Sequence, residues 1–343
     1  MSQEKLATKY KIVIGSTTLM QKEADALQMA TVEDHVDMVA MATVRVGGAE
    51  DHPKWNFKIG DAVTVEIEGK SLFSGEVIAM EPGYQVEGNT TMTLRAMDKS
   101  HRLGRGKKTR FWNDKKDSDV AQEVGSECGL GVDADDTGEM LPYILQRNES
   151  NIAFLKRLAA RNNYQLRVDG DSLLFKKATF SGGGVQVKMG GEDGTLRSMR
   201  MSFNSAEQVQ KVVVRGWDTA TKQEIVGTAT TGDVTAIGGG DLGASASSIF
   251  GESTAYITDV PVTSQAMANQ IAKAEMERHA RQFCRGSCSV TGNPDIKAGS
   301  TVEFSGLSSG QNGTFYIVAS RHIISARTGY STELTFCSNT LGS

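Results

Sequence analysis

The sequence predicts a mainly β protein with a small α+β module set between two similar β-units. Three observations carry this prediction. A strand-rich segment near the start of the chain recurs near its end, alternating apolar and polar residues mark its strands, and helical periodicity is confined to short stretches. Gly is abundant (37) and Pro scarce (5), which suits many strand turns. A chain of 343 residues is long enough for two or more domains.

The first β-unit, residues 1–100, contains the segments KIGDAVTVEIEG, FSGEVIAM and TMTLRAM. The second, residues 181–343, repeats them as KAGSTVEFSG, NGTFYIVAS and STELTF. In each copy one glycine opens a strand and a second glycine opens the next; these are Gly60 and Gly75, then Gly299 and Gly313. A duplicated β-unit indicates a protein that tiles or docks, and does not by itself indicate a catalyst.

Strand alternation assigns side chains to two faces of each unit, because successive residues of a strand point to opposite sides. Such one-face-buried sheets close into barrels or sandwiches, since open edges invite unwanted pairing, and the pattern alone does not distinguish the two. The residues expected to share one face are Val63, Val65 and Ile67 in the first copy, and Val302 with Phe304, then Phe315, Ile317 and Ala319, in the second.

Residues 101–180 carry the α+β module. Helices are expected near 118–129, with Ser118 as N-cap and Gly129 as the stop, and after Ser150. The strands that follow flank Asp169-Gly170, a dipeptide typical of a tight hairpin. This module therefore contains two helices and a hairpin.

The second β-unit is expected to open with a Gly-rich link from Ser181 and the strand QKVVVRGWD, which ends at Asp218. A polar Gly/Ser-rich insertion at about 219–254 interrupts it, and we expect this stretch to be too poor in large apolar residues to form core. A third helix, roughly 264–283, leads into the repeated strands.

Charge and cysteine content exclude several classes of protein. A net charge of -4 and a pI near 5.8 argue against a general polyanion binder, and four Cys in this length do not make a disulfide scaffold. No apolar signal core begins the chain, and no run of about 18 apolar residues spans a bilayer. We expect assembly in the bacterial cytoplasm.

Three segments match the residue pattern of a catalytic or ligand-binding motif, but each lacks a structural feature or residue that its motif requires. The run Gly306–Gly310 fits a nucleophile elbow but precedes an alternating strand, so a hairpin turn is expected. Gly238–Gly243 fits a dinucleotide fingerprint without its βαβ setting, so a flexible loop is expected. Asp133, Asp135 and Gly138 begin like a calcium loop, but Ile144 stands where its Glu belongs. We assign no catalytic, cofactor or metal residue.

Two clusters have a ligand-binding alternative. His279, Cys284 and Cys288 lie close in sequence, and ordinary packing is expected over a zinc site completed by Cys337. A basic run surrounds Phe111 and Trp112, and nearby acids favour a solvated or subunit-facing loop over a phosphate contact. Its cations are Arg105, Lys107, Lys108, Arg110, Lys115 and Lys116.

The order of the parts resembles a known family. A first β-unit ending in TLRAMDKSHRL, the module with QRNESNIAFLKRLAARNNYQLRVDGDSLLF, the strand VVVRGWD and the closing SRHIISARTGYSTELTF look like the baseplate hub of contractile phage tails. This is the late control protein D family, which shares its fold with the hub half of the valine-glycine-repeat (VgrG-type) spike protein of type VI secretion. The likeness runs from about Tyr10 to Cys337.

The resemblance implies two tube-like β-barrels per chain and a homotrimer whose six barrels match a sixfold tail tube on one side and a threefold spike on the other. It implies a tail-tube protein, a separate spike protein and other baseplate proteins as partners, with no cofactor, specific nucleic acid or membrane span. The chain stops at Ser343 without the spike domains of fused relatives, so we expect the spike on another polypeptide. The positions that mark the shared pattern are Gly60, Gly75, Asp98, Gln146, Phe154, Leu155, Asp218, His322 and Tyr330, most of them expected in turn or core roles.

The implied function is mechanical: the trimer nucleates the inner tube, holds the spike and forms part of a virion tail or of a toxin-delivering injection particle. Two alternatives come from other classes. A tail-associated peptidoglycan hydrolase would need a domain with paired carboxylates, and a hexameric tail-tube protein would be a single barrel. The length and the duplication favour the hub.

Overall fold

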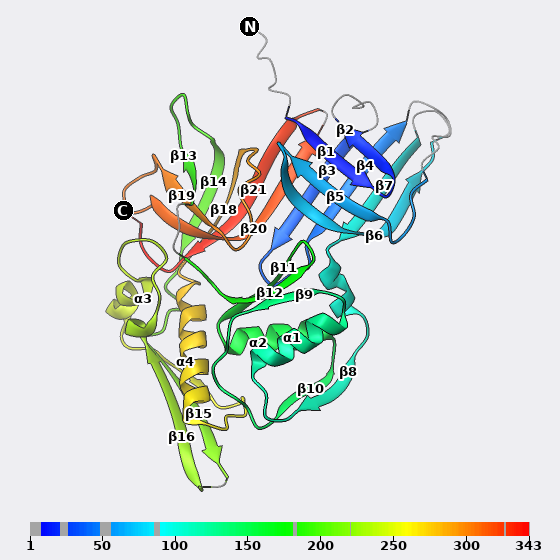
Figure 1. Ribbon diagram of the computed structural model, residues 1–343. Coiled ribbons are helices and arrows are strands. Elements are labelled where there is room, and N and C mark those ends of the chain that lie inside the picture. The colour runs from blue at the N-terminus through cyan, green and yellow to red at the C-terminus, as the bar shows by residue number, and fades with distance from the viewer. Residues whose placement is uncertain are drawn as a thin grey trace.

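A large β-sheet dominates the molecule and lies against a smaller module of helices and short strands (Figure 1). The structure, a computed structural model, describes residues 8–20, 27–48, 56–85, 90–180, 184–219, 221–325 and 327–342. The first residues of the predicted Gly-rich link, 181–183, lie outside this range.

Both predicted β-units are part of one 13-stranded sheet. Its first half contains β1 (Tyr10–Ile14), β2 (Thr17–Met20), β3 (Leu27–His35), β4 (Met41–Gly48), β5 (Ala62–Ile67), β6 (Lys70–Gly83) and β7 (Thr90–Met97). Its second half contains β13 (Val185–Lys188), β14 (Leu196–Phe203), β18 (Cys284–Thr291), β19 (Thr301–Ser305), β20 (Gly313–Ser325) and β21 (Gly329–Ser338). The mainly β class with a small α+β module is confirmed, and the two units are the two curled halves of this sheet (Figure 1).

The two halves share one topology. Their neighbouring strands run in the orders β3-β4-β7-β6-β5 and β14-β18-β21-β20-β19, and every pair within each series is antiparallel. The strands also follow one another along the chain in the same sequence in both halves. The halves differ at their flanks, because β1 pairs antiparallel with β5 whereas β13 pairs parallel with β19.

Irregularities of register recur at equivalent places. The β6–β7 register shifts between Val77 and Ala79, and the β20–β21 register shifts between Ile317 and Ala319. A second matching shift lies at Leu27/Met29 of β3 and at Leu196/Ser198 of β14. Bulges re-aim a strand at defined positions, so their recurrence marks the halves as copies in detail.

The turn before each copy's first repeated strand is also the same. Gly60 N–H donates to the Val77 carbonyl at 2.8 Å, and Gly299 N–H donates to the Ile317 carbonyl at 2.9 Å. Both glycines have positive φ, +92° and +81°, a conformation that side chains other than glycine rarely adopt.

Two details of the predicted repeat are wrong. Gly75 lies within β6 opposite Val63, and the residue at the equivalent place opposite Val302 is Phe315 rather than Gly313. The bulge at Ile317/Ala319 also turns Ala319 away from the face of Phe315, because one extra residue reverses the alternation.

Each half of the sheet has its own hydrophobic core. Aliphatic residues such as Val65 and Ile67 fill the first, and the predicted alternation of β5 is confirmed by its burial. Three rings, Phe304, Phe315 and Phe336, fill the second with centroids 4.9–5.4 Å apart. Aromatic and aliphatic packing therefore fill equivalent spaces in the two halves.

The helical module follows the first half. It contains η2 (Lys99–Gly104), β8 (Lys108–Trp112), α1 (Asp117–Glu127), β9 (Gly131–Ala134), β10 (Ile144–Glu149), α2 (Asn151–Arg161), β11 (Tyr164–Asp169) and β12 (Ser172–Lys177). The helix predicted after Ser150 is confirmed as α2, and the Ser150 hydroxyl caps it by accepting from Ala153 N–H at 3.3 Å. Strands β11 and β12 form the predicted hairpin. The predicted N-cap of α1 is wrong: it is Lys116, because the helix begins one residue before Ser118.

A second small unit interrupts the second half of the sheet. It contains β15 (Lys211–Asp218), β16 (Gln223–Thr230), η3 (Thr231–Asp233), α3 (Gly243–Ala246), η4 (Ser247–Phe250), β17 (Thr254–Ile257) and α4 (Gln265–Ala280). We expected Lys211–Asp218 to begin the second β-unit. This is wrong, because β15 pairs with β16 and β17 in a separate three-stranded sheet that packs on α4.

The predicted insertion at 219–254 is likewise part of the folded structure. Ile225, Ala229 and Ile237 are buried, so the expectation that this stretch forms no core is wrong. One hydrophobic cluster joins Phe154 of α2 to Ile271 of α4, so the module and the inserted unit share a core. The unit occupies the connection from β14 to β18, where the first half has only the short turn from β3 to β4.

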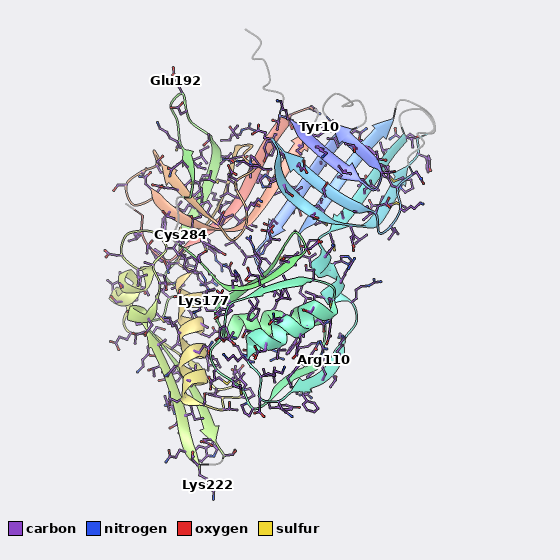
Figure 2. All side chains as sticks on the ribbon, in the orientation of Figure 1. Tyr10, Arg110, Lys177, Glu192, Lys222 and Cys284 are labelled. Atoms are coloured by element: carbon purple, nitrogen blue, oxygen red, sulfur yellow. The ribbon has the colours of Figure 1, made fainter. Side chains whose placement is uncertain are left out.

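The two projecting tips lie at opposite ends of the molecule. Figure 2 shows Glu192, between β13 and β14, at the sheet end, and Lys222, between β15 and β16, at the far end of the inserted unit. Among the described residues, no helix combines the length and apolar character that crossing a bilayer requires.

We predict that Gly75→Ala destabilises the protein by about 1–3 kcal/mol, because overpacking of a filled core costs that much. A Cβ at Gly75 would lie 2.3 Å from the Met97 carbonyl oxygen, which belongs to backbone and cannot move aside. Urea unfolding measures the change. Gly239→Ala is the control, since a Cβ there meets nothing within 4 Å and its φ is not positive; equal effects of the two variants would contradict the prediction.

Candidate assembly surface

The junction between the two halves of the sheet is a run of antiparallel pairing between β3 and β20. Seven residue pairs join the strands, from Ala319 opposite His35 to Ser325 opposite Met29. Strand β20 has room for this because β19 pairs only with its first part, up to Tyr316. The faces of both halves thereby become continuous.

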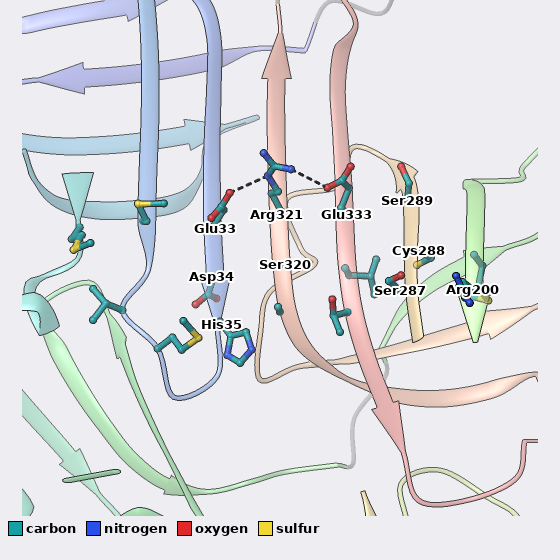
Figure 3. A pocket seen from close by; sticks show the side chains of 18 of the residues that line it. Glu33, Asp34, His35, Arg200, Ser287, Cys288, Ser289, Ser320, Arg321 and Glu333 are labelled. Carbon is teal, nitrogen blue, oxygen red and sulfur yellow. Dashed lines mark hydrogen bonds and ion pairs between the residues drawn. The ribbon is translucent and has the colours of Figure 1, made fainter. Parts of the chain in front are cut away.

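Arg321 lies at the centre of the junction, on the face opposite the two cores (Figure 3). Its Nε lies 3.0 Å from Glu33 Oε1 on β3, and its Nη1 lies 3.4 Å from Glu333 Oε2 on β21. All three side chains are about half exposed, so each pair contributes roughly 0–1 kcal/mol. This arrangement makes a solvated face of mixed charge, and does little to hold the sheet together.

A hollow of about 940 Å³ opens on this polar face. Strands β3, β14, β18, β20 and β21 form its floor, and Ile152 and Lys156 of α2 border it. Four methionines, Met38, Met41, Met97 and Met199, line it with the charged and hydroxyl side chains. Methionine side chains adapt to irregular neighbours, which suits a protein contact.

The hollow lacks an activated nucleophile among its described residues. Burial raises the pKa of the Cys288 thiol to about 12, so it stays protonated and unreactive. Burial also raises the pKa of the Asp34 carboxyl. Asp98 is committed to structure, since its two carboxylate oxygens accept from Ala40 N–H at 2.6 Å and Ser100 N–H at 2.7 Å.

His322 lies beside Arg321 on β20 but points to the core side, where it is 2% exposed. Its Nδ1 lies 2.8 Å from the Tyr330 hydroxyl and its Nε2 lies 2.9 Å from the Ile296 carbonyl. A carbonyl only accepts, so Nε2 carries the proton and Nδ1 accepts from Tyr330. Burial lowers the pKa of His322 to about 4, and burial raises the pKa of Tyr330. The pair is a neutral structural contact.

Gln146 organises the polar part of the module. It is fully buried; its Oε1 accepts from Arg110 Nε at 2.8 Å, and its Nε2 donates to the Glu149 carbonyl and to Asn151 Oδ1, each at 3.0 Å. These bonds satisfy a buried amide and fix the entry into α2.

The other predicted family positions also serve the fold. Phe154 and Leu155 are fully buried in α2, and the Phe154 ring stacks on Trp112 at 5.2 Å. Asp218 accepts from the Thr221 hydroxyl at 2.7 Å in the turn after β15. Gly60 and Gly75 have the turn and close-approach roles described above. The structure brings His322 and Tyr330 together and leaves the remaining positions spread over the sheet, the module and the inserted unit.

The alternative ligand clusters have partners within the protein. Among the described residues no group of three His, Cys, Asp or Glu could hold a metal. The His279 ring lies 3.0 Å from the Glu207 carbonyl, and burial raises the pKa of the Cys284 thiol to about 12. In the basic run, Arg110 pairs with Glu127 at 2.7 Å and Lys116 with Asp136 at 3.0 Å. The predicted loop is wrong for part of this run, because Lys108 and Arg110 lie on strand β8.

Gly306–Gly310 lies in the hairpin between β19 and β20, as predicted. The Gly238–Gly243 run is not the free loop that we expected. A Cβ at Gly240 would lie 2.0 Å from the Leu341 carbonyl oxygen, and α3 begins at Gly243.

Sequence reasoning missed the polar row at the junction. Arg321, Glu33 and Glu333 come from distant segments, and only the pairing of β3 with β20 brings them together. The available signal was the presence of charges at alternate positions of otherwise apolar strands.

Comparisons with known proteins identify the family. A family model described as the Alg8 N-terminal domain matches residues 9–326, and the chain belongs to this family. No curated protein matches the sequence.

Solved structures share the fold along nearly the whole chain. The 43 kDa tail protein of prophage MuSo2 from Shewanella oneidensis has a TM-score of 0.73 at 18% identity and covers 96% of this chain and 98% of its own. A tail protein from Neisseria meningitidis MC58 has a TM-score of 0.72 at 12% identity, with 97% of each chain covered. An E. coli type VI secretion component, described as similar to bacteriophage T4 tail proteins gp27 and gp5, has a TM-score of 0.62 at 8% identity and covers 97% of this chain and 77% of its own.

We predict that the stability of the protein falls with acidification through the titration of His322. Its folded pKa, about 4, lies below the ordinary value of 6.5, so the contribution is complete above about pH 6.5 and is lost as the pH falls toward 4. The expected loss is about 3 kcal/mol, because each tenfold difference in proton affinity between the folded and unfolded states corresponds to about 1.4 kcal/mol. Unfolding free energies from pH 7.5 to 4.5 should show a smaller slope for His322→Gln.

His279→Gln, a change of the same kind at a partly exposed position, is the matched control for the effect of replacing a histidine by glutamine. Buried carboxyls such as Asp34 have raised pKa values and act in the opposite direction, so the difference between variants is the relevant quantity. Identical slopes for wild type and His322→Gln would rule out the assignment.

Proposed function

We propose that this member of the Alg8 N-terminal domain family is the structural hub of the baseplate of a contractile tail or injection system. Three copies form a ring that adapts a sixfold inner tube to a threefold spike and nucleates tube assembly. The observation that carries the proposal is the duplicated half-sheet, which repeats strand order and bulges within one chain.

Symmetry explains why duplication suits an adaptor. Three chains that each carry two equivalent units present six similar surfaces, whereas every part that occurs once per chain appears three times in the ring. The half-sheets occur twice, and the module with its inserted unit occurs once. In Figure 1 the module lies to one side of the sheet. We therefore place the tube at the end of the half-sheets that is farthest from the module, and the spike at the end that carries the module.

The polar face is suited to a lumen. Its charges are of both signs and several are paired, as in Arg321 with Glu33 and Arg95 with Glu81, each at 3.0 Å. A wall of this kind lacks the sustained positive charge that would retain nucleic acid. The hydrophobic cores of the two halves lie on the opposite face. The polar face can therefore line a passage while the cores stay buried.

The partners that follow are a tail-tube protein, a spike protein and other baseplate proteins. The site of action is the virion tail or injection particle, assembled in the bacterial cytoplasm. Support comes from the fold, which a phage tail protein and a type VI secretion component share. No enzymatic activity forms part of this proposal, because the polar groups of the hollow serve the fold or face solvent.

We predict that the purified protein associates into a species with three times the 36.8 kDa mass of one chain, alone or when mixed with its spike and tube proteins. Analytical ultracentrifugation measures the mass. A species of six copies would favour the tail-tube alternative, and a chain that stayed monomeric with both partners present would contradict the hub.

A further inference from the structure

Among the open sheet edges of the described residues, two are the equivalents of the two edges that pair at the junction. Strand β14 ends the sheet, and β6 has no neighbour on its β5 side beyond Glu76, where the β5 pairing stops. Their counterparts in the other half, β3 and the second part of β20, pair with each other. Unpaired edges invite a strand of another chain.

We propose that β14 of one copy pairs antiparallel with the second part of β6 in the next copy, so that three copies close into a continuous ring. The inference rests on the proposed function, which supplies the trimer, and it names the strands and the register that hold the trimer together. The occupant of each edge is a second copy of this chain.

The matching bulges fix the register. Because Val77 corresponds to Ile317, residues 79–85 correspond to 319–325; because Leu196 corresponds to Leu27, residues 198–204 correspond to 29–35. Transferring the β3–β20 register places Glu81 opposite Ser202, as Arg321 lies opposite Glu33. The same transfer places Tyr84 opposite Met199.

At both edges, backbone N–H and carbonyl groups point outward from the sheet, where a strand of the next copy would lie. Asn204 N–H donates to the Phe283 carbonyl at 2.8 Å on the β18 side, so by alternation the groups of Phe203 and Met201 point outward. At the internal junction the Val318 carbonyl accepts from Val36 N–H at 2.9 Å, which aims alternate carbonyls of β20 at β3.

The equivalent carbonyls of β6, from Met80 onward, face the open edge. The Pro82 carbonyl is one of these, but Pro82 has no N–H. The transferred register places Met201 opposite Pro82, so these two residues make one hydrogen bond in place of two. A proline whose missing N–H faces an open edge also limits pairing with unrelated strands.

Side-chain exposure shows what the neighbour would cover. Tyr84 is 73% exposed, whereas its counterpart Ile324 is 5% exposed under β3. Met199 is partly buried, whereas its counterpart Ala30 is completely buried under β20. Pairing would lay Tyr84 on Met199 and so bury an apolar contact between copies.

Charge selects the partner edge. Arg200 has no ion-pair partner in the part of the chain that the structure describes, and the transferred register places it diagonally across from Glu81. Relative to the internal junction, the signs are reversed, since there β20 carries Arg321 and β3 carries Glu33. Pairing β3 with β6 would set Glu33 opposite Glu81, so the charges favour alternation of the two kinds of half around the ring.

Cysteine cross-linking of the full chain tests the register. Glu81→Cys combined with Ser202→Cys places two thiols on residues of neighbouring copies that lie directly opposite each other on the exposed face. Mild oxidation should convert the protein into a covalent trimer, which a reductant should separate into single chains. Glu81→Cys with Ser198→Cys is the control, because Ser198 shares the face but lies four residues along the strand, about 13 Å away. The wild-type chain reports any background from the partly exposed Cys128.

A covalent trimer specific to the first pair supports the inference. A trimer by mass that gives no link, or links only through the control, overturns the inference and leaves the proposed hub standing. A protein that stays monomeric with the spike and tube proteins present contradicts both.

A charge variant tests the partner choice independently. Arg200→Glu sets two acids across the interface and should weaken trimer association by about tenfold at low salt, while high salt reduces the effect. Arg197→Glu, an exposed change of the same size on the same strand outside the register, should leave association unchanged. Equal behaviour of the two variants overturns the register.

Discussion

The pairing of β3 with β20 is the contact on which the rest of the architecture depends. Seven opposed residue pairs turn two half-sheets, each with its own core, into one surface. Strand β20 reaches both neighbours because it is 13 residues long and bulged at Ile317/Ala319. The bulge also sends Arg321 to the polar face and His322 to the core, so the charged row and the neutral histidine contact have a common origin.

The departures from exact duplication carry as much information as the duplication. The connection from β14 to β18 holds a complete small unit, and its helix α4 shares a hydrophobic cluster with α2 of the preceding module. The molecule thus contains parts present twice and parts present once. In the ring of three chains that we propose, the repeated parts would give sixfold character where they meet a partner, and the parts present once would give threefold character.

Many of the charged side chains are paired with a neighbour of opposite sign. Acids of α1 pair with part of the basic run of the module, as in Lys115 with Glu123 and Arg110 with Glu127. The polar side chains among the predicted family positions make contacts within the fold: Asp98 caps a turn, Gln146 satisfies buried groups, and His322 is held neutral. Such internally satisfied groups hold the surfaces of the protein rigid.

The sequence by itself determined the mainly β class, the repeat, the two helices of the module and the turn role of Gly60, because these follow from local periodicity and backbone conformation. The prediction that Lys211–Asp218 begins the second β-unit was wrong, and so was the prediction that 219–254 forms no core. The hydrophobic pattern of a strand does not determine which strand it pairs with. Only the tertiary structure decided that β3 meets β20, that Phe315 replaces Gly75 in the second copy, and that the edges of β14 and of the second part of β6 stay open. Those outcomes depend on register and bulges, which are set by contacts between residues far apart in the chain.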